Sequence, residues 1–411
     1  MAVNVMSNAV GKETVAALNA IAATIAANKA PADVTWKDIA RYADNGIISN
    51  VLAIGDQVVE TWTDKVPSAP VEYECPMDLV HIQDIELEDG TILKNRPIFQ
   101  THWATKNGVP FSGYRAFVSC PDGLAAGTYY VTIDGTWGSN VSNGDVVCFT
   151  LTQNVPAGGR IGGMHNAPDA KKDTWRVYSY AADGKTLIET VTPTFTASGT
   201  SLGTLKQTAR ATEPGYGNTK LNCLQEAGCG SNRWATSALR QYLNSTADKG
   251  QWWTPQDEWD IAPAEAATVP GYLTGFSADF VAQLKPMKVV TYKNHTTYDE
   301  TPDVTYDKVY TPALEQVYAK KQHAGEGEVF AYWRRRIGGA SPQNYSWESN
   351  PINVNRIQYA IEDHASAQSV RLRSASLDNS YYPWCGGSSG GVNDYNNSAG
   401  WVVRCSPIVS I

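Results

Sequence analysis

Short runs of β-branched and aromatic residues, separated by turn-forming pairs, recur through the first half of the chain. Residues 126–135 read AGTYYVTIDG and residues 145–153 read DVVCFTLTQ, with Asn143-Gly144 between them. Asp183-Gly184 interrupts a further run of this kind. Asn-Gly and Asp-Gly favour tight turns, because Gly adopts positive φ without a steric penalty. This pattern predicts a succession of antiparallel hairpins.

Three parts follow from the pattern along the chain. Residues 1–53 form an N-terminal helical segment, with an Ala-rich amphipathic stretch at 11–29 that could make a weak coiled coil and a short helix from Trp36 to Tyr42. Residues 54–200 form a β-rich domain, for which a sandwich is one arrangement. Residues 201–411 mix helices and short strands, so we predict an α+β fold class.

In this last part, residues 232–246 give the strongest helical pattern, with Asn232 as the predicted N-cap. Shorter helices are expected at 277–284 and 312–319. Short strands are predicted at 287–292, 329–333, 370–375, 400–405 and 407–411.

Composition excludes several classes of function. The net charge is −8 and Lys plus Arg number only 33 of 411 residues, so we expect no nucleic-acid partner, whose phosphates call for basic residues. No stretch has the ~18 apolar residues of a membrane helix. Seven Cys, an odd number without a CxxC pair, indicate a reducing compartment and no disulfide framework. We recognise no signal peptide at the start.

Catalytic signatures are absent from the sequence pattern. The six His are scattered without an HxxxH or HExxH pair, and no GxSxG elbow occurs. Asp299, Glu300, Asp303 and Asp307 could chelate Ca²⁺, but their order fits no EF-hand, and a solvated loop is the simpler interpretation. We therefore expect no enzyme, no metal site and no cofactor.

The stretch SLDNSYYPWCGGSSGGVNDYNNSAG, residues 376–400, has an unusual composition. Ser, Gly, Asn, Tyr and Trp make up most of it, and Lys, Arg, Glu and His are missing. A plain surface loop does not explain the aromatics, and a buried core does not explain the lack of aliphatic residues. Tyr and Trp supply stiff contact area while Ser, Gly and Asn supply adaptable hydrogen bonds, as in antibody loops. The composition therefore favours a binding surface.

Codon chemistry points to the same segment. Asn is encoded by AAC. The codons TAC for Tyr, AGC for Ser and GAC for Asp each differ from AAC at a single adenine. Adenine-directed mutagenesis of Asn codons would leave these four residues, whereas ordinary drift would also bring Lys, Glu, Thr and Gln.

These features support a resemblance to a known family. VRLRSAS (370–376) and SAGWVVRCSP (398–407) look like the fixed frame around the C-terminal variable region, about 370–405, of proteins diversified by diversity-generating retroelements. Upstream, NRWATSALRQYLNS, QWWTP, GYLTGFSADFVAQL and YDKVYTPALEQV resemble tail-associated and adhesin-like proteins of this kind from phages and gut bacteria.

The resemblance implies a C-type-lectin-like fold of the formylglycine-generating-enzyme subtype for residues 201–411, with variable residues on a ligand-facing surface. Arg371, Arg373 and Arg404 are expected to anchor the frame, and the pairs Gly386-Gly387 and Gly390-Gly391 to turn the chain. The predicted solvent-facing, ligand-binding residues are Ser376, Asp378, Asn379, Ser380, Tyr381, Tyr382, Trp384, Asn393, Asp394, Tyr395, Asn396, Asn397 and Ser398.

The function implied is display: a phage tail or receptor-binding protein, or a bacterial adhesin, that binds a host-surface protein or glycan. The expected location is the virion or the bacterial cell surface, and a homo-oligomer such as a trimer fits the analogy. Two alternatives remain open. One is a lectin-fold enzyme, an oxidase using Cys385 and Cys405 or a glycan-active tail hydrolase. The other is a structural virion protein with residues 376–400 buried against another subunit.

Overall fold

The computed structural model of the protein describes residues 34–135, 141–164, 172–207, 221–294, 301–318, 325–336, 351–393 and 398–411. Over these ranges the chain combines many short strands with a few short helices, which confirms the α+β class. The helix expected at 11–29 lies outside the described residues. None of the described helices has both the length and the apolar character needed to cross a bilayer.

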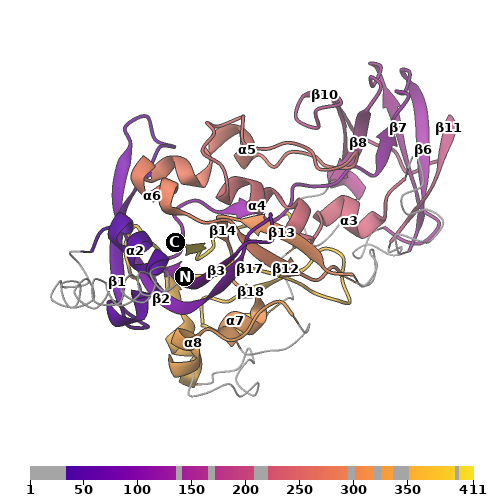
Figure 1. Ribbon diagram of the computed structural model, residues 1–411. Coiled ribbons are helices and arrows are strands. Elements are labelled where there is room, and N and C mark those ends of the chain that lie inside the picture. Colours follow the sequence, from indigo (N-terminus) through magenta and orange to yellow (C-terminus); the bar gives the residue numbers. More distant parts are fainter. Residues whose placement is uncertain are drawn as a thin grey trace, which may run out of the picture.

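The central sheet joins strands from both ends of the chain (Figure 1). Its order is β1 (Gln57–Asp64), β2 (Val71–Glu86), β3 (Ile92–Thr101), β21 (Ile408–Ser410) and β14 (Val309–Tyr310), with antiparallel neighbours throughout. Val409 of β21 is paired with Phe99 on one side and with Val309 on the other. The last strand of the chain is therefore an inner strand with partners on both edges.

The first hydrophobic core surrounds this sheet and contains residues from Val34 to Ile411. Helix α2 (Trp36–Asp44), which confirms the short helix predicted there, begins with a capping box in which Asp38 N donates to the Thr35 hydroxyl at 3.2 Å. Trp36 contacts Phe280 and, in β3, Phe99, with ring centroids 4.8 and 5.2 Å away. Residues more than 200 positions apart thus share one core.

The remaining helical elements are short. They are the α-helices α3 (Leu224–Cys229), α4 (Ala238–Leu243), α5 (Glu265–Thr268), α6 (Ala278–Gln283), α7 (Leu314–Tyr318) and α8 (Ala331–Arg336), and the 3₁₀ turns η2 (Ile48–Asn50), η3 (Lys172–Thr174), η4 (Trp234–Thr236), η5 (Tyr272–Gly275) and η6 (Pro351–Arg356). Helices α6 and α7 confirm the segments predicted near 277–284 and 312–319.

Two further sheets enclose a second hydrophobic core at the opposite end of the molecule from α2 and β1 (Figure 1). One is ordered β10 (Leu187–Val191), β9 (Arg176–Tyr180), β8 (Gly159–Met164) and β5 (Val118–Cys120); the other is ordered β11 (Thr200–Lys206), β6 (Gly127–Asp134) and β7 (Val146–Leu151). The arrangement has the form of a sandwich. It begins only at β5, because β1 to β3 belong to the central sheet.

The turn signals of the sandwich are confirmed. Strands β6 and β7 form a hairpin whose Gly144 has φ +88°, and β9 and β10 form one whose Gly184 has φ +64°. These positive φ values are the reason that Gly follows Asn and Asp at the two turns.

Four small sheets complete the described strands. They are β12 (Met287–Thr291) with β13 (Asp303–Asp307), β15 (Gln358–Tyr359) with β16 (Ala367–Gln368), β20 (Val402–Val403) with β4 (Val109–Pro110), and the three-stranded sheet β17 (Val370–Ala375), β18 (Pro383–Gly386) and β19 (Val392–Asn393). In the three-stranded sheet β18 lies in the middle, and every residue of the three strands is buried.

Two local predictions for the C-terminal part are wrong. The strand expected at 329–333 does not form: helix α8 begins at Ala331, and both Phe330, just before it, and Trp333 within it are buried in the core. The helix expected over 232–246 begins only at Ala238, with the Ser237 hydroxyl as its N-cap. Asn232, predicted to cap it, has another role.

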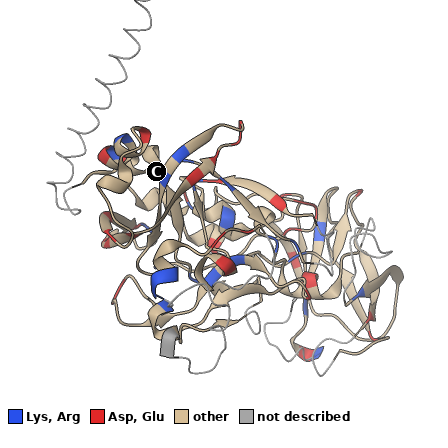
Figure 2. Cartoon of the chain, turned by 60° about the horizontal axis from the view of Figure 1, so that its bottom comes forward, with Lys and Arg blue, Asp and Glu red and all other residues tan. Residues whose placement is uncertain are grey.

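Basic and acidic residues are interspersed in the charge view of the chain (Figure 2). The arginine run at the end of α8 is used partly within the protein itself. Arg336 lies over the Tyr332 ring, 5.1 Å from its centroid, and Arg335 donates to the Ile54 carbonyl at 3.2 Å. Arg335 and Arg336 are exposed, and both also make contacts within the protein.

The inner position of β21 generates a stability prediction. We expect Ile408→Ala, at a side chain with no exposed surface, to lower the free energy of unfolding by about 2–5 kcal/mol. The matched control is Ile92→Ala in β3, where the side chain is 46% exposed and the expected change is about 0.5 kcal/mol or less. Equal losses in urea denaturation would contradict the inner-strand assignment.

Candidate functional site

The structure places the predicted ligand-facing residues in three groups. Asp378 is exposed, while Asn379, Tyr381 and Tyr382 are half-buried. Residues 394–397 lie outside the described part of the chain. The solvent-facing prediction is wrong for the third group, whose relative exposures are 0–7%: Ser376, Ser380, Trp384, Asn393 and Ser398.

Strand pairing and main-chain contacts explain this burial. Trp384 belongs to the middle strand β18 and packs in the first core, and Asn393 is paired with Cys385 of that strand. The Ser398 carbonyl accepts hydrogen bonds from Arg371 Nη2 at 3.1 Å and from Trp401 N at 3.0 Å. Composition did not reveal this burial, because small polar residues can be buried when hydrogen bonds replace water.

The exposed and half-buried residues lie together in the 376–382 loop, the connection between β17 and β18. The loop closes on itself through a hydrogen bond of 2.8 Å from Ser376 N to the Tyr382 carbonyl. The rings of Tyr381 and Tyr382 are in contact, with centroids 4.2 Å apart. This tight loop thus carries two adjacent aromatic side chains at the surface of the protein.

Asn232 holds the 376–382 loop from beneath. Its side chain is completely buried, and Nδ2 donates to the carbonyls of Ser376, Asn379 and Tyr382 at 3.2, 2.8 and 3.0 Å. The Asn232 main-chain N donates to the Ser380 carbonyl at 3.1 Å. One residue therefore fixes four main-chain oxygens of the loop.

Asn232 is itself oriented by a second buried amide. Asn294, also completely buried, donates from Nδ2 to Asn232 Oδ1 at 2.9 Å. This bond directs the Asn232 amide hydrogens toward the loop carbonyls. On its other side the loop is tied by Ala399 N, which donates to the Tyr381 carbonyl at 2.7 Å.

The structure confirms that three arginines anchor the frame around the loop. Arg371 and Arg373 of β17 are buried; Arg371 Nη1 lies 3.2 Å from Cys385 Sγ, and Arg373 Nη1 donates to Gln316 Oε1 at 2.7 Å. Arg404 forms a bidentate pair with Glu362 at 2.6 and 2.7 Å. Planar guanidinium groups suit such fixed contacts.

The cysteines considered for an oxidase are buried and free. Burial raises the pKa of the Cys385 thiol, although Arg371 beside it acts in the opposite direction. Burial raises the pKa of the Cys405 thiol to about 12, and its Sγ lies 3.7 Å from the Thr105 hydroxyl. A thiol with a raised pKa forms little thiolate at neutral pH, so these surroundings favour a structural role. All seven cysteines are free, as predicted.

Two of the carboxylates considered for Ca²⁺ bind arginines instead. Asp303 accepts two hydrogen bonds from Arg233 at 2.7 and 2.8 Å. Asp307 is 1% exposed, which makes the solvated-loop interpretation wrong for this residue, and it binds Arg240 at 2.6 Å and the Trp234 indole at 3.0 Å. Among the described residues no group of three or more His, Cys, Asp or Glu side chains is arranged to hold a metal ion.

Sequence reasoning missed the exposed residues that follow the loop's anchor at Ala399. Trp401 is 46% exposed and Val402 is 55% exposed. Trp401 and Val402 lie in residues 400–405, which the sequence pattern predicts to be a strand. In the structure the strand β20 contains only Val402 and Val403. No local signal marks Trp401 as exposed, because it opens the apolar run Trp401-Val402-Val403, which is typical of a buried strand.

The Asn232 contacts predict a specific loss on substitution. We expect Asn232→Ala to lower the free energy of unfolding by about 1–3 kcal/mol, because buried loop carbonyls lose their donor. Amide hydrogen exchange should also accelerate in the 376–382 loop. The matched control is Asn50→Ala at an exposed position, expected to leave both quantities unchanged. Unchanged exchange in Asn232→Ala would show that the loop is held by other contacts.

The burial of Trp384 predicts a contrast between two tryptophans. Trp384→Ala should cost about 3–5 kcal/mol of stability, because it empties a core position. Trp401→Ala should cost about 1 kcal/mol or less. Guanidinium denaturation of both variants measures the difference, and similar losses would contradict the two placements.

Comparison with known proteins gives one match. Residues 218–409 match the family described as Domain of unknown function (DUF6273). The matched region starts just before α3, includes Asn232, the 376–382 loop and the three anchoring arginines, and ends within β21. No curated protein and no solved structure matches the chain.

Proposed function

We propose that this protein is a ligand-binding display protein whose contact surface is the 376–382 loop. The proposal rests on the hydrogen bonds that hold the loop, which are made to its main-chain carbonyls. The carbonyls of Ser376, Asn379, Ser380, Tyr381 and Tyr382 all accept hydrogen bonds from Asn232, Ala399 or the loop itself. Main-chain carbonyls are present whatever the side chain.

The mode of attachment determines which positions tolerate change. Side chains at 378, 379, 381 and 382 can be replaced while Asn232 keeps the same acceptors. Asn379 adds one local contact, since its Oδ1 accepts from Tyr381 N at 3.0 Å. A frame fixed by main-chain bonds and a variable outer layer is the arrangement expected of a diversified binding surface.

The side chains now present suit macromolecular recognition. Tyr381 and Tyr382 offer amphipathic rings with few rotatable bonds, so ordering them on binding costs little entropy. Trp401 lies close by along the chain, two residues after Ala399, and adds a further exposed ring. The acidic residue Asp378 at the outer edge of the loop provides a charged contact.

The resemblance to retroelement-diversified proteins supplies the biological setting of this proposal. The partner is a host-cell surface protein or glycan, and the protein is carried on a phage tail or a bacterial surface in a C-type-lectin-like fold. Several copies, for example a trimer, compensate for weak binding at each site, because linked sites bind with a raised effective concentration.

The test uses the double variant Tyr381→Ser/Tyr382→Ser. We expect it to lose binding to bacterial cells that the fluorescently labelled wild type binds, while its free energy of unfolding falls by no more than about 1–2 kcal/mol. The control Tyr130→Ser, at a half-buried tyrosine of the sandwich, should keep cell binding. Full cell binding by the double variant would refute the assignment of this surface.

A genomic observation tests the diversification itself. We expect a reverse transcriptase gene near this gene, and a second copy of its 3′ end that differs only at adenines. A second copy with differences at all four bases would rule out the mechanism while leaving ligand binding open to the cell assay.

A further inference from the structure

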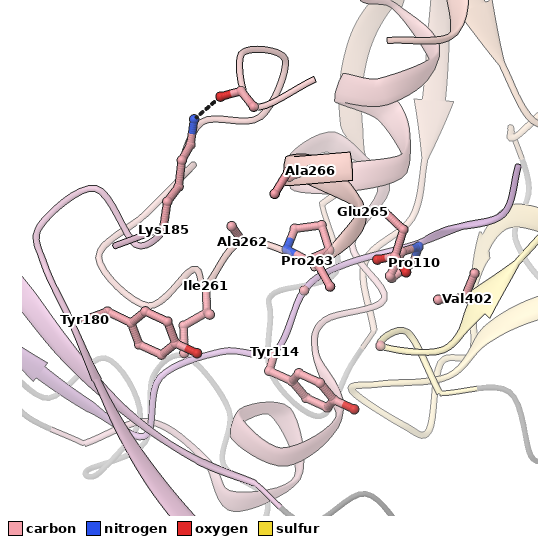
Figure 3. A pocket seen from close by; sticks show the side chains of 15 residues that line it. Pro110, Tyr114, Tyr180, Lys185, Ile261, Ala262, Pro263, Glu265, Ala266 and Val402 are labelled. Atoms are coloured by element: carbon pink, nitrogen blue, oxygen red, sulfur yellow. Dashed lines mark hydrogen bonds between the residues drawn. The ribbon is translucent and has the colours of Figure 1, made fainter. Parts of the chain in front are cut away.

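A cleft of about 490 Å³ is lined by residues from several parts of the chain (Figure 3). Its walls come from residues 110–114, from the β9–β10 hairpin, from residues 261–267 and from Gly400 and Val402. This volume is in the range of small-molecule sites. Gly113 lets two walls approach, because a Cβ there would lie 1.9 Å from the Ile261 carbonyl oxygen.

Most of the lining is apolar and small. Proline, alanine and glycine dominate it, together with Ile261, Val402 and the rings of Tyr114 and Tyr180. Such walls favour an organic ligand with an apolar body, since they offer contact area but few hydrogen bonds. Burial raises the pKa of the Tyr180 phenol to about 12, so both phenols remain neutral hydrogen-bonding groups at physiological pH.

Two lining residues carry a charge, and their situations differ. Lys185 is already engaged: its Nζ donates to the Gly250 carbonyl at 3.3 Å and lies 5.7 Å from the centroid of the Trp253 ring. In Figure 3 its side chain runs away from Tyr114 and Tyr180. Lys185 is therefore not placed to neutralise a negative charge elsewhere in the cleft.

Glu265 is the second charged residue. It is half-buried at the start of α5, and its carboxylate forms no ion pair within the part of the chain that the structure describes. Burial raises the pKa of the Glu265 carboxyl, and the Glu265 charge contributes to the raised pKa of Tyr114. Glu265 and Tyr114 both line the cleft. A partly desolvated carboxylate without a counter-ion is stabilised by a cation that enters beside it.

We propose that this cleft binds a small organic cation, an ammonium group carried on an apolar body. The ammonium pairs with Glu265, and the body lies against Ile261, Val402 and the ring of Tyr114. Aromatic faces add to the attraction, because a cation over a ring is favoured by the ring's quadrupole. The site is separate from the display surface proposed above and does not depend on it.

Benzylamine is a suitable probe, with benzyl alcohol as its uncharged analogue of nearly the same shape. We expect the wild type to bind benzylamine with a Kd on the order of millimolar, measured by chemical-shift titration, and benzyl alcohol about tenfold more weakly. Glu265→Gln should weaken benzylamine binding about tenfold and leave benzyl alcohol unchanged. The matched control Glu258→Gln removes the same charge from an exposed position that does not line the cleft and should have no effect.

Two further variants locate the site. Ala267→Phe, at an exposed lining position, should fill the cleft and abolish binding of both probes without loss of folding. Tyr381→Ser/Tyr382→Ser should bind benzylamine like the wild type, which separates this inference from the display function. The proposal is overturned by the absence of saturable benzylamine binding, by equal binding in Glu265→Gln, or by binding that persists in Ala267→Phe.

Discussion

The pairing of β21 with β3 and β14 is the constraint on which much of the structure depends. An inner strand must be hydrogen-bonded on both edges, so the end of the chain has a fixed position in the central sheet. Strands β17, β18 and β19, which precede β21 in the chain, are buried along their whole length. This explains why a segment rich in Ser, Gly and Asn contains so many buried positions.

The 376–382 loop is held in place through its main-chain carbonyls. Asn232 and Asn294 form a buried amide pair that satisfies the loop carbonyls. A buried polar network of this kind is stable only when its members are satisfied, so the geometry of the loop is strongly specified. The contacts of Asn232 are made to main-chain carbonyls of the loop and not to its side chains.

The 376–382 loop and the cleft both involve one short stretch of chain. Ala399 ties the Tyr381 carbonyl, and the next residue, Gly400, lines the cleft together with Val402. Arg115, next to the lining residue Tyr114, binds Asp257 and Asp260 at 2.6 and 2.9 Å. These ion pairs join the chain beside Tyr114 to the chain just before Ile261, which also lines the cleft.

The sequence by itself determined the features that depend on neighbours along the chain. Asn143-Gly144 and Asp183-Gly184 specify their hairpins because only the local φ values matter there, and Ser277 caps α6 for an equally local reason. The α+β class and the structural role of Arg371 were also predictable from pattern and resemblance. Only the tertiary structure decided which distant residues pack together. It determined the burial of Trp384 and of Trp333 in α8, the pairing of β1–β3 with β21 and β14 in the central sheet, and the hydrogen bonds from Asn232 to the loop. Each of these depends on residues a hundred or more positions away, and no local pattern records which distant groups will meet.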